Sequence, residues 1–465
     1  MKIALAHFRV GETDGVSLEM EKWKLVLEQM GHEVVFLAGS HGTGNAYVID
    51  ELHYKHPRNN LFVDNAYDER ANYLTEQALK EDILAFAKQI EHKLCEFITT
   101  HHIDMMIPNN IWSLGWGLPA GIAFTEAAKR TGIAFVAHHH DFYWERERYS
   151  HPTCSFVQEW LETYFPPNLS NVKHVVINEI AKAELYERRG IEATVVPNVF
   201  DFSGEPWVAD DFNADFRQAI GVKEQDLLVL QATRITERKA IELGIDVVAE
   251  MQKPEYLQTL QEKGLYNGKR FEADSKIVYV FAGLPESTDQ YLEQLNEKAA
   301  KLNVDIRYVN DHIEHERVQH EETKSFSLWD AYVHADYVTY PSILEGWGNQ
   351  LLEAVYARKP MVIYEYPVYE KDIKAKHFNF ESLGNTHTVQ DNGLVQVADQ
   401  RVREAAQAAI DTLTDRSRYE AVTSHNFDIG KTYYSYESLY GYLSQVIEPA
   451  NEKQEVDTPE LKSLS

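Results

Sequence analysis

Short apolar runs alternate along the chain with longer stretches in which apolar residues recur at helical spacing. The first run, KIALAHF at 2–8, reads as a buried strand, and the helical pattern at 16–31 ends on Gly31, a residue type that commonly terminates helices. A second strand follows at 33–39, and residues 70–100 have the pattern of one long helix. Four more strands are predicted at IDMMIPNN (103–110), IAFVAHHHD (133–141), VKHVVIN (172–178) and ATVVPN (193–198). This alternation is typical of a doubly wound α/β domain, a parallel sheet with helices on both faces.

The same pattern restarts after an irregular stretch rich in Asp, Gly and Pro at 199–225. The second set of strands is predicted at DLLVLQATR (226–234), KIVYVFAG (276–283), DIRYVN (305–310), YVTYPS (337–342) and MVIYEY (361–366). The chain should therefore contain two Rossmann-like domains. Ligands of such sheets bind beyond the carboxyl ends of the strands, and the cleft between two such domains is the expected binding site.

The expected domain boundaries follow from these two sets of strands. Residues 1–200 form the first domain, 201–225 a linker, and 226–430 the second domain. A final helix at 431–448 is expected to complete the first domain, and the tail at 449–465 is expected to be disordered. Two segments fall outside the shared pattern. They are an insertion at 252–275 and a very polar loop at 311–326, which we expect to be exposed.

Charge and cysteine content narrow the function classes. Among 465 residues, 45 Lys and Arg against 73 Asp and Glu give a formal net charge of −28, which disfavours nucleic acid and anionic membranes as partners. Cys95 and Cys154 form neither a metal-type pair nor a disulfide framework, and a cytoplasmic location is expected. The N-terminal apolar run is too short for a signal peptide, and no stretch is long enough to span a membrane.

The stretch PSILEGWGNQLLE at 341–353 contains the most informative chemistry. Glu345 lies in the loop after a strand, and Glu353 lies on the second turn of the following helix. The free backbone N–H groups at the start of this helix suit an anion, and Gly346 and Gly348 allow a ligand close to the backbone. A carboxylate one turn further in would suit neutral hydroxyls such as those of ribose. The alternative is an ordinary helix start with an acidic surface residue.

Two cations follow the first strand of the second domain, in QATRITERK at 231–239. Arg234 ends the strand and Lys239 lies at the next helix start, where a cation is unfavourable for the helix itself. Arg and Lys after a strand can converge on a diphosphate, with the Arg binding in a bidentate manner and the Lys acting as a point charge. Two solvated surface cations are the alternative.

Two weaker signals lie in the first domain. The loop GETDG at 11–15 precedes a helix, and Gly15 would permit backbone contact with a phosphate or sugar. An ordinary strand-to-helix turn is the alternative. In HHHD at 138–141, strand alternation separates His139 from the other two histidines, so metal ligation by the run is not expected. The aromatic residues at 142–144 would form either a sugar-stacking wall or ordinary loop packing. No P-loop, HExxH, GxSxG or CxxC is present, and no DxD stands in a convincing position for a metal.

Taken together, these residues resemble the retaining glycosyltransferases of the GT-B fold, the group that includes sucrose and trehalose synthases and many mannosyltransferases. The resemblance runs from the first strand to about residue 448. The matching segments are DGV after the first strand, HHHD, VVPNVFD (195–201), R-ITER-K, ADYVTYPSILEGWGNQLLEA and the final YYSYESLYGYL helix. It implies an α/β GT-B fold in which two Rossmann-like domains face a central cleft.

The resemblance also implies a role for each matching residue in the second domain. Glu345 would hold hydroxyls of the donor sugar and Glu353 the ribose hydroxyls, while Arg234 and Lys239 would neutralise the leaving diphosphate. The loop and helix start would contact the donor through Gly346, Gly348, Asn349 and Gln350. In the first domain, the corresponding contacts would come from Gly15, His140 and Asp141.

The implied function is transfer of glucose or mannose from a nucleotide-diphosphate sugar to a hydroxyl of a small soluble acceptor, without a metal or other cofactor. Asn349 and Gln350 stand where many relatives have apolar residues or Pro, and Asp14 stands where a second Gly is usual. Donor identity, acceptor and oligomeric state stay open. The alternatives are a phosphorylase of the same fold that uses free phosphate, a non-catalytic nucleotide-sugar-binding subunit, and a sugar-nucleotide epimerase.

Overall fold

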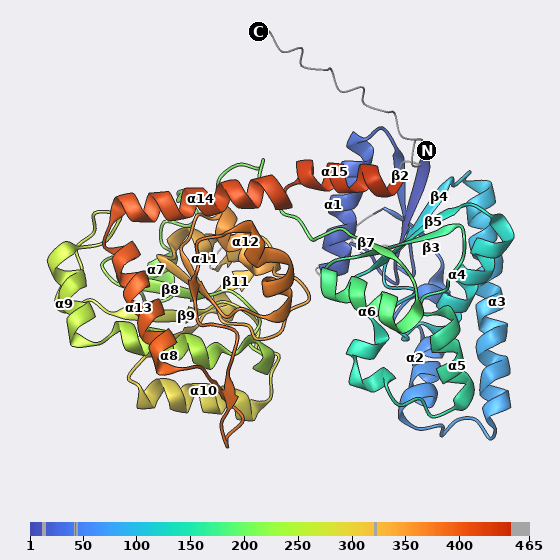
Figure 1. The fold of residues 1–465 in the computed structure, drawn as a ribbon, viewed down its shortest axis with the longest axis horizontal. Helices are drawn as coiled ribbons and strands as arrows, with labels where there is room; N and C mark the ends of the chain where they lie inside the picture. The colour runs from blue at the N-terminus through green and yellow to red at the C-terminus, as the bar shows by residue number, and fades with distance from the viewer. Residues whose placement is uncertain (12–14, 41, 43–44, 320–322, 448–465) are drawn as a thin grey trace, which may run out of the picture. The chain divides into compact units, whose positions relative to one another are not determined.

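The computed structural model describes residues 1–11, 15–40, 42, 45–319 and 323–447, and these fall into two units. Unit 1 comprises Met1–Ile177, Ala181–Val196 and the chain from Glu437 onward, whereas unit 2 comprises Asn178–Ile180 and Pro197–Tyr436. Each unit is an α/β layer structure around its own sheet (Figure 1). The tail at 449–465, expected to be disordered, and Asp14 lie outside the described residues.

Unit 1 is built on a seven-stranded sheet in the order β3-β2-β1-β4-β5-β6-β7, with all neighbours parallel. Its strands are β1 (Lys2–Ala6), β2 (Glu33–Ala38), β3 (Ala46–Val48), β4 (Met105–Pro108), β5 (Ala134–His139), β6 (Val172–Val176) and β7 (Ala193–Val195). Its helices are α1 (Gly15–Gln29), α2 (Pro57–Val63), α3 (Glu76–Thr100), α4 (Leu118–Thr131), α5 (Ser155–Tyr164), α6 (Glu179–Arg189) and α15 (Tyr436–Ile447).

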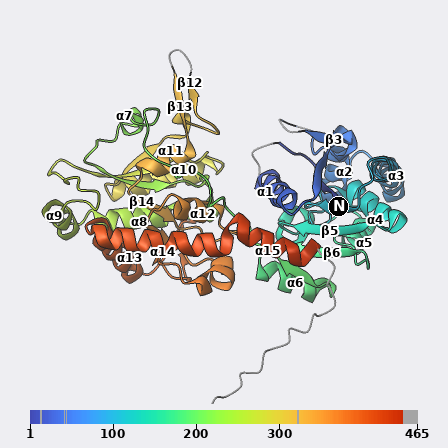
Figure 2. The ribbon, with the colours of Figure 1, turned by 90° about the horizontal axis from the view of Figure 1, so that it is seen from above.

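The strand order reverses direction at β1 and β4, so right-handed connections place α1 and α4 on opposite faces of the sheet. Figure 2 shows α1 and the α3–α4 pair on the two sides of these strands. The long helix α3 packs against α4 through an apolar stripe that includes Leu79, Phe86 and Leu94. The carboxyl ends of β1, β4 and β5 therefore lie side by side, which is the edge where a ligand of this sheet would bind.

Unit 2 is built on a six-stranded parallel sheet in the order β10-β9-β8-β14-β15-β16. The strands are β8 (Leu227–Gln231), β9 (Ile277–Phe281), β10 (Asp305–Tyr308), β14 (Tyr337–Tyr340), β15 (Met361–Ile363) and β16 (Glu381–Ser382). The helices are α7 (Phe216–Ala219), α8 (Ile241–Met251), α9 (Pro254–Lys263), α10 (Asp289–Lys301), α11 (Leu328–His334), α12 (Asn349–Tyr356), α13 (Asp399–Leu413) and α14 (Arg416–Tyr434). Two small sheets add β11 (Ile313–Glu314), β12 (Val318–Gln319) and β13 (Lys324–Ser327), and β17 (Thr388–Val389) with β18 (Val395–Gln396).

The polar segment 311–326 corrects one expectation from the sequence. Where an exposed loop was predicted, the described residues form the small sheet β11-β13-β12. The prediction failed because the apolar residues Ile313, Val318 and Phe326 are too widely separated in the sequence to give a strand pattern. The part of the prediction that concerns 320–322 lies outside the described residues.

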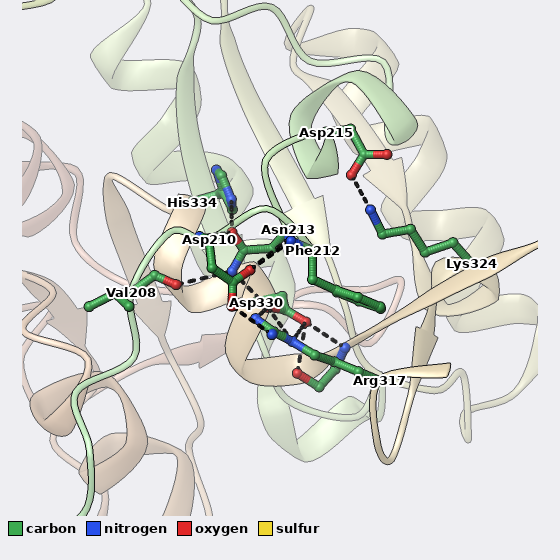
Figure 3. Close-up of polar contacts among 10 residues, drawn as sticks. Val208, Asp210, Phe212, Asn213, Asp215, Arg317, Lys324, Asp330 and His334 are labelled. Atoms are coloured by element: carbon green, nitrogen blue, oxygen red, sulfur yellow. Dashed lines mark hydrogen bonds and ion pairs between the residues drawn. The ribbon is translucent and has the colours of Figure 1, made fainter. Parts of the chain in front are cut away.

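Ion pairs fasten this small sheet to residues that the sequence suggested were a linker (Figure 3). Arg317 binds the fully buried carboxylate of Asp330 at 2.6 Å and the exposed carboxylate of Asp210 at 2.7 Å. Asp330 also accepts hydrogen bonds from the Asn213 side-chain amide at 2.8 Å and from the Ser327 hydroxyl at 2.9 Å. Residues 210–217 are therefore part of the folded unit 2 and not a simple connection.

We expect Asp330→Ala to lower the free energy of unfolding by about 3 kcal/mol, because it leaves Arg317 and Asn213 without their buried partner. Urea unfolding followed by tryptophan fluorescence measures this loss. The matched control is Asp215→Ala, which removes the exposed Asp215–Lys324 pair at 2.6 Å from the same region (Figure 3) and should change the free energy of unfolding by no more than about 0.5 kcal/mol. Equal losses in the two variants would contradict the role given to Asp330.

Candidate functional site

The loop after β14 reaches helix α12 through a turn that requires glycine at position 348. The Tyr366 hydroxyl donates to the carbonyl of Trp347 at 2.6 Å, and a Cβ added at Gly348 would lie 2.5 Å from that hydroxyl oxygen. Gly348 has no capping side chain, and α12 begins at Asn349. The first N–H groups of this helix therefore have no partner within the helix, as an anion site requires.

Glu345 is the buried charge of this loop, and two cations share its carboxylate. Lys239 Nζ pairs with Oε1, and Arg238 Nη1 pairs with Oε2 at 2.9 Å. The side chains of Glu345 and Lys239 are only 8% and 5% exposed, whereas Arg238 is 49% exposed. The sequence paired Lys239 with Arg234, but in the structure its ion-pair partner is Glu345.

Burial and the neighbouring charges have opposite effects on the pKa values of Glu345 and Lys239. Burial alone would raise the pKa of Glu345, but the charges of Lys239 and Arg238 outweigh it and hold that pKa below its ordinary value. Burial lowers the pKa of the Lys239 ammonium, and the Glu345 carboxylate offsets only part of this effect. The carboxylate is therefore ionised at neutral pH, and its charge depends on both cations.

Arg234 lies apart from this group. Its side chain is 59% exposed, and Nη1 pairs with Glu286 Oε2 at 2.9 Å. Its charge is nevertheless close enough to lower the pKa of Lys239 further. An exposed guanidinium with a solvated partner can exchange that partner for a phosphate at small cost, so the position is compatible with the role predicted for it.

The start of α12 carries the other predicted contacts of unit 2. The Tyr332 hydroxyl donates to Glu353 Oε2 at 3.0 Å, which fixes this half-buried carboxylate on the second turn. Asn198 Nδ2 donates to the side-chain oxygen of Asn349 at 3.1 Å, and Asn178 Nδ2 donates to the carbonyl of Gly346 at 2.8 Å. The loop and the helix start are thus held by side chains far from them in the sequence. Gln350 lies half-buried beside Asn349.

In unit 1, two asparagines after β4 organise the predicted His140 and Asp141. Asn109 Oδ1 lies 3.2 Å from His140 Nε2, while Asn109 Nδ2 donates to the carbonyl of Ile107. Asn110 accepts from the His140 backbone N–H and donates to Asp141 Oδ1, each at 2.8 Å. Because the Asn109 oxygen can only accept, His140 Nε2 carries the hydrogen in this arrangement. Arg146 pairs with the second oxygen of Asp141, so both oxygens already have partners.

The histidine run has the alternation that a strand requires. The rings of His138 and His140 are 4.1 Å apart, and His138 stacks on Trp23, whereas His139 points the other way and lies 3.1 Å from His174. Burial lowers the pKa of His138 and His139 well below the usual value, so both rings are neutral. Within the described ranges there is no group of three His, Cys, Asp or Glu residues placed to hold a metal ion.

Two other predictions for unit 1 meet different outcomes. Of the two readings of residues 142–144, packing is favoured, because Phe142 is fully buried and the Trp144 ring lies between Phe142 and Arg188. Gly15 is exposed as the first residue of α1, and a Cβ there would meet nothing within 4 Å. The rest of its loop, 12–14, lies outside the described residues.

Sequence reasoning missed the residues that hold the predicted ones. These are Arg238, Tyr332, Tyr366, Asn109, Asn110, Asn178 and Asn198. Only Arg238 gave a usable signal, a second cation beside Lys239 in the segment ERK. In the part of the chain that the structure describes, no helix is both long enough and apolar enough to cross a membrane.

The turn at Gly348 leads to a test by double substitution. We expect Gly348→Ala to cost about 2 kcal/mol of unfolding free energy, because the new methyl group overpacks against the Tyr366 hydroxyl. In a Tyr366→Phe background the same change should cost about 1 kcal/mol less, since the obstructing oxygen is gone. Urea unfolding of the two single variants and the double variant measures this coupling, and strict additivity would show that the Tyr366 hydroxyl does not impose the glycine.

Comparisons with known proteins show to which family the chain belongs. Residues 212–424 match the model of the family described as glycosyl transferases group 1. The mannosylglucosylglycerate synthase of Thermotoga maritima is 40% identical over 450 residues, which cover 97% of this chain and all of that protein. The mannosylglucosylglycerate synthase of Petrotoga mobilis is 39% identical over 434 residues, 93% of this chain and 97% of its own length.

The fold is also found among solved structures. A glycosyltransferase from Rickettsia africae superposes with a TM-score of 0.58 at 11% identity, covering 96% of this chain and 97% of that one. Because identity to the two synthases is high over nearly the whole chain, the family is shown: this protein is a glycosyltransferase of group 1 with the GT-B fold of two Rossmann-like domains.

Proposed function

We propose that this enzyme transfers a mannosyl group from a nucleotide-diphosphate mannose to a hydroxyl of glucosylglycerate, with retention of the anomeric configuration. The observation that carries the proposal is the identity of 39% and 40% to two proteins named mannosylglucosylglycerate synthase. Such an acceptor is a small soluble hydroxyl compound, as the sequence predicts. The proposed location is the cytoplasm.

The cations Lys239 and Arg234 and the start of α12 supply chemistry that suits this transfer. In the reaction, the bond between the sugar C1 and the phosphate oxygen breaks, and a bond forms between C1 and the acceptor oxygen. The acceptor proton passes to the leaving phosphate. Negative charge grows on the diphosphate, and Lys239, Arg234 and the N–H groups at the start of α12 stabilise it without reorganising. No base of high strength is needed on the protein, since the leaving phosphate takes the proton.

The remaining residues bind and orient the donor in this proposal. Glu345 holds hydroxyls of the donor sugar, and Glu353, fixed by Tyr332 at 3.0 Å, holds the ribose hydroxyls. Gly346 and Gly348 bring the backbone close to the diphosphate and sugar, and Asn349 and Gln350 contact them. In unit 1, the proposed contacts come from Gly15, His140 and Asp141.

The donor and acceptor are tested directly with the purified protein. Thermal unfolding with GDP, UDP, ADP and inorganic phosphate identifies the nucleotide, because a ligand at about 100 times its dissociation constant stabilises by about 2.7 kcal/mol. The mannose derivative of that nucleotide is then incubated with glucosylglycerate, and proton NMR of the product gives the anomeric configuration. We expect transfer with retention, undiminished by EDTA. Stabilisation by phosphate alone, with release of a sugar phosphate, would replace this proposal by a phosphorylase.

The proposed roles of Lys239 and Glu353 predict different kinetic defects. Lys239→Ala should lower kcat by about 100-fold or more, because it removes a charge that stabilises the leaving diphosphate. Glu353→Ala should instead weaken donor binding by about 10- to 100-fold, the effect of lost hydrogen bonds to a charged group. Steady-state kinetics and calorimetric titration with the nucleotide separate the two effects.

The control for Lys239→Ala is Lys298→Ala. Lys298 is 15% exposed and pairs with Asp246 at 2.7 Å on the helices α10 and α8, so its loss also breaks a largely buried ion pair in unit 2. We expect kcat to be unchanged in this variant. If Lys239→Ala turned over as fast as Lys298→Ala, the diphosphate role of Lys239 would be wrong.

A further inference from the structure

Arg238 connects the turn that carries Lys239 with the loop that carries Glu345. Its backbone carbonyl accepts from the N–H of Ile343 at 3.0 Å, and its Nη1 donates to the carbonyl of Leu344 at 3.0 Å and to Glu345 Oε2 at 2.9 Å. Three contacts thus connect the turn at Glu237–Lys239 with the loop that begins after β14. Neither the motif spacing nor the proposed function gives this residue a role.

The two cations on Glu345 are held by different sets of contacts. Lys239 is 5% exposed and contacts Oε1 with a compact ammonium whose three donors can turn to new acceptors. Arg238 contacts Oε2 with a planar guanidinium that the Leu344 carbonyl also holds. Arg238 Nη1 therefore has a second acceptor in the same loop, whereas the ion pair of Lys239 is with Glu345 alone among the described residues.

The proposed function places a second demand on Lys239, and this inference rests on it. When negative charge grows on the leaving diphosphate, the ammonium is attracted toward the phosphate oxygens and away from Glu345. A carboxylate that is 8% exposed is costly to keep ionised without a partner. The incoming anion also disfavours the ionised carboxylate by like-charge repulsion. A second cation that does not move would prevent both losses.

We propose that Arg238 is a positioning residue, which keeps the Glu345 carboxylate ionised and in place while Lys239 turns toward the departing diphosphate. Arg234 does not take this place, because its guanidinium is paired with Glu286. Glu345 is then able to hold the donor sugar throughout the reaction, and Lys239 is free to follow the leaving group.

The proposal predicts a shift in the pH dependence of turnover. The hydroxyls of Ser342, Tyr340 and Tyr366 also lie near Glu345. Arg238 supplies one of the two charges that lower the pKa of Glu345. Activity that needs the ionised carboxylate is present above this pKa and is lost as the pH falls through it. Removal of Arg238 raises the pKa, and the acidic limb of the profile of kcat against pH moves to higher pH.

The test compares wild type, Arg238→Gln and Arg238→Lys, with the proposed nucleotide-diphosphate mannose as donor and glucosylglycerate as acceptor. In Arg238→Gln we expect kcat at neutral pH to fall about 10-fold and the acidic limb to rise by about one pH unit, while KM for the donor changes by less than about 3-fold. Arg238→Lys restores the charge, so its acidic limb should return toward that of wild type. A merely structural role would lower activity at every pH and leave the limb in place.

Arg307→Gln is the matched control. Arg307 has the same kind of contacts in unit 2, a carboxylate of Asp305 at 2.9 Å and the carbonyl of Gly221 at 3.0 Å, but it lies on the edge strand β10. The profile of kcat against pH in Arg307→Gln should equal that of wild type. An unchanged acidic limb in Arg238→Gln would overturn the role of Arg238. Absence of turnover by wild type itself would overturn the proposed function instead, so the two failures are distinguished.

Discussion

The buried carboxylate of Glu345 is the constraint on which the site of unit 2 depends. An ion that is 8% exposed requires opposite charge within contact distance, and this requirement brings the turn at 237–239 against the loop after β14. Lys239 and Arg238 satisfy it from one side, and the loop is thereby fixed before it enters α12. Gly348 then makes the turn under the Tyr366 hydroxyl, so the free N–H groups of the helix begin at a defined place. The ion pairs of Glu345 and the position of the start of α12 thus depend on the same loop conformation.

The sequence predicts most of the central sheets and part of this site. Strands such as β1, β5, β8 and β9 are continuous apolar runs, and both sheets bury them on two faces, so their positions can be read directly from composition. The short strands β3, β11 and β12 cannot be read in this way, because two or three residues give no periodicity. A linker was expected at 201–225 because that stretch is irregular and polar. Asn213 and Arg217 are polar but buried, and polar residues hold them in unit 2.

The site residues divide by the kind of information that identifies them. Lys239, Glu345 and Gly348 lie at strand ends or helix starts, where spacing along the chain indicates their chemistry. Asn198 and Arg238 act through side-chain contacts with residues more than a hundred positions away in the sequence. A single sequence contains no information on such pairs, and therefore the supporting residues were found only from the structure.

The three cations Arg234, Arg238 and Lys239 are each paired with a carboxylate of unit 2. Arg234 is paired with Glu286, and Lys239 and Arg238 share Glu345. In a chain of net charge −28, these carboxylates keep the cations oriented, and under the proposed function a donor diphosphate has to compete with them. In this proposal, the diphosphate competes least well with Glu286 and Glu345 in the ground state of the donor. It attracts the cations more strongly as negative charge accumulates on the leaving group. Interactions that strengthen toward the transition state lower the barrier, whereas equally strong binding of the ground state does not. Under the proposed function, the internal pairs therefore favour catalysis over tight binding of the donor, provided that one cation remains on Glu345 when the other follows the leaving group.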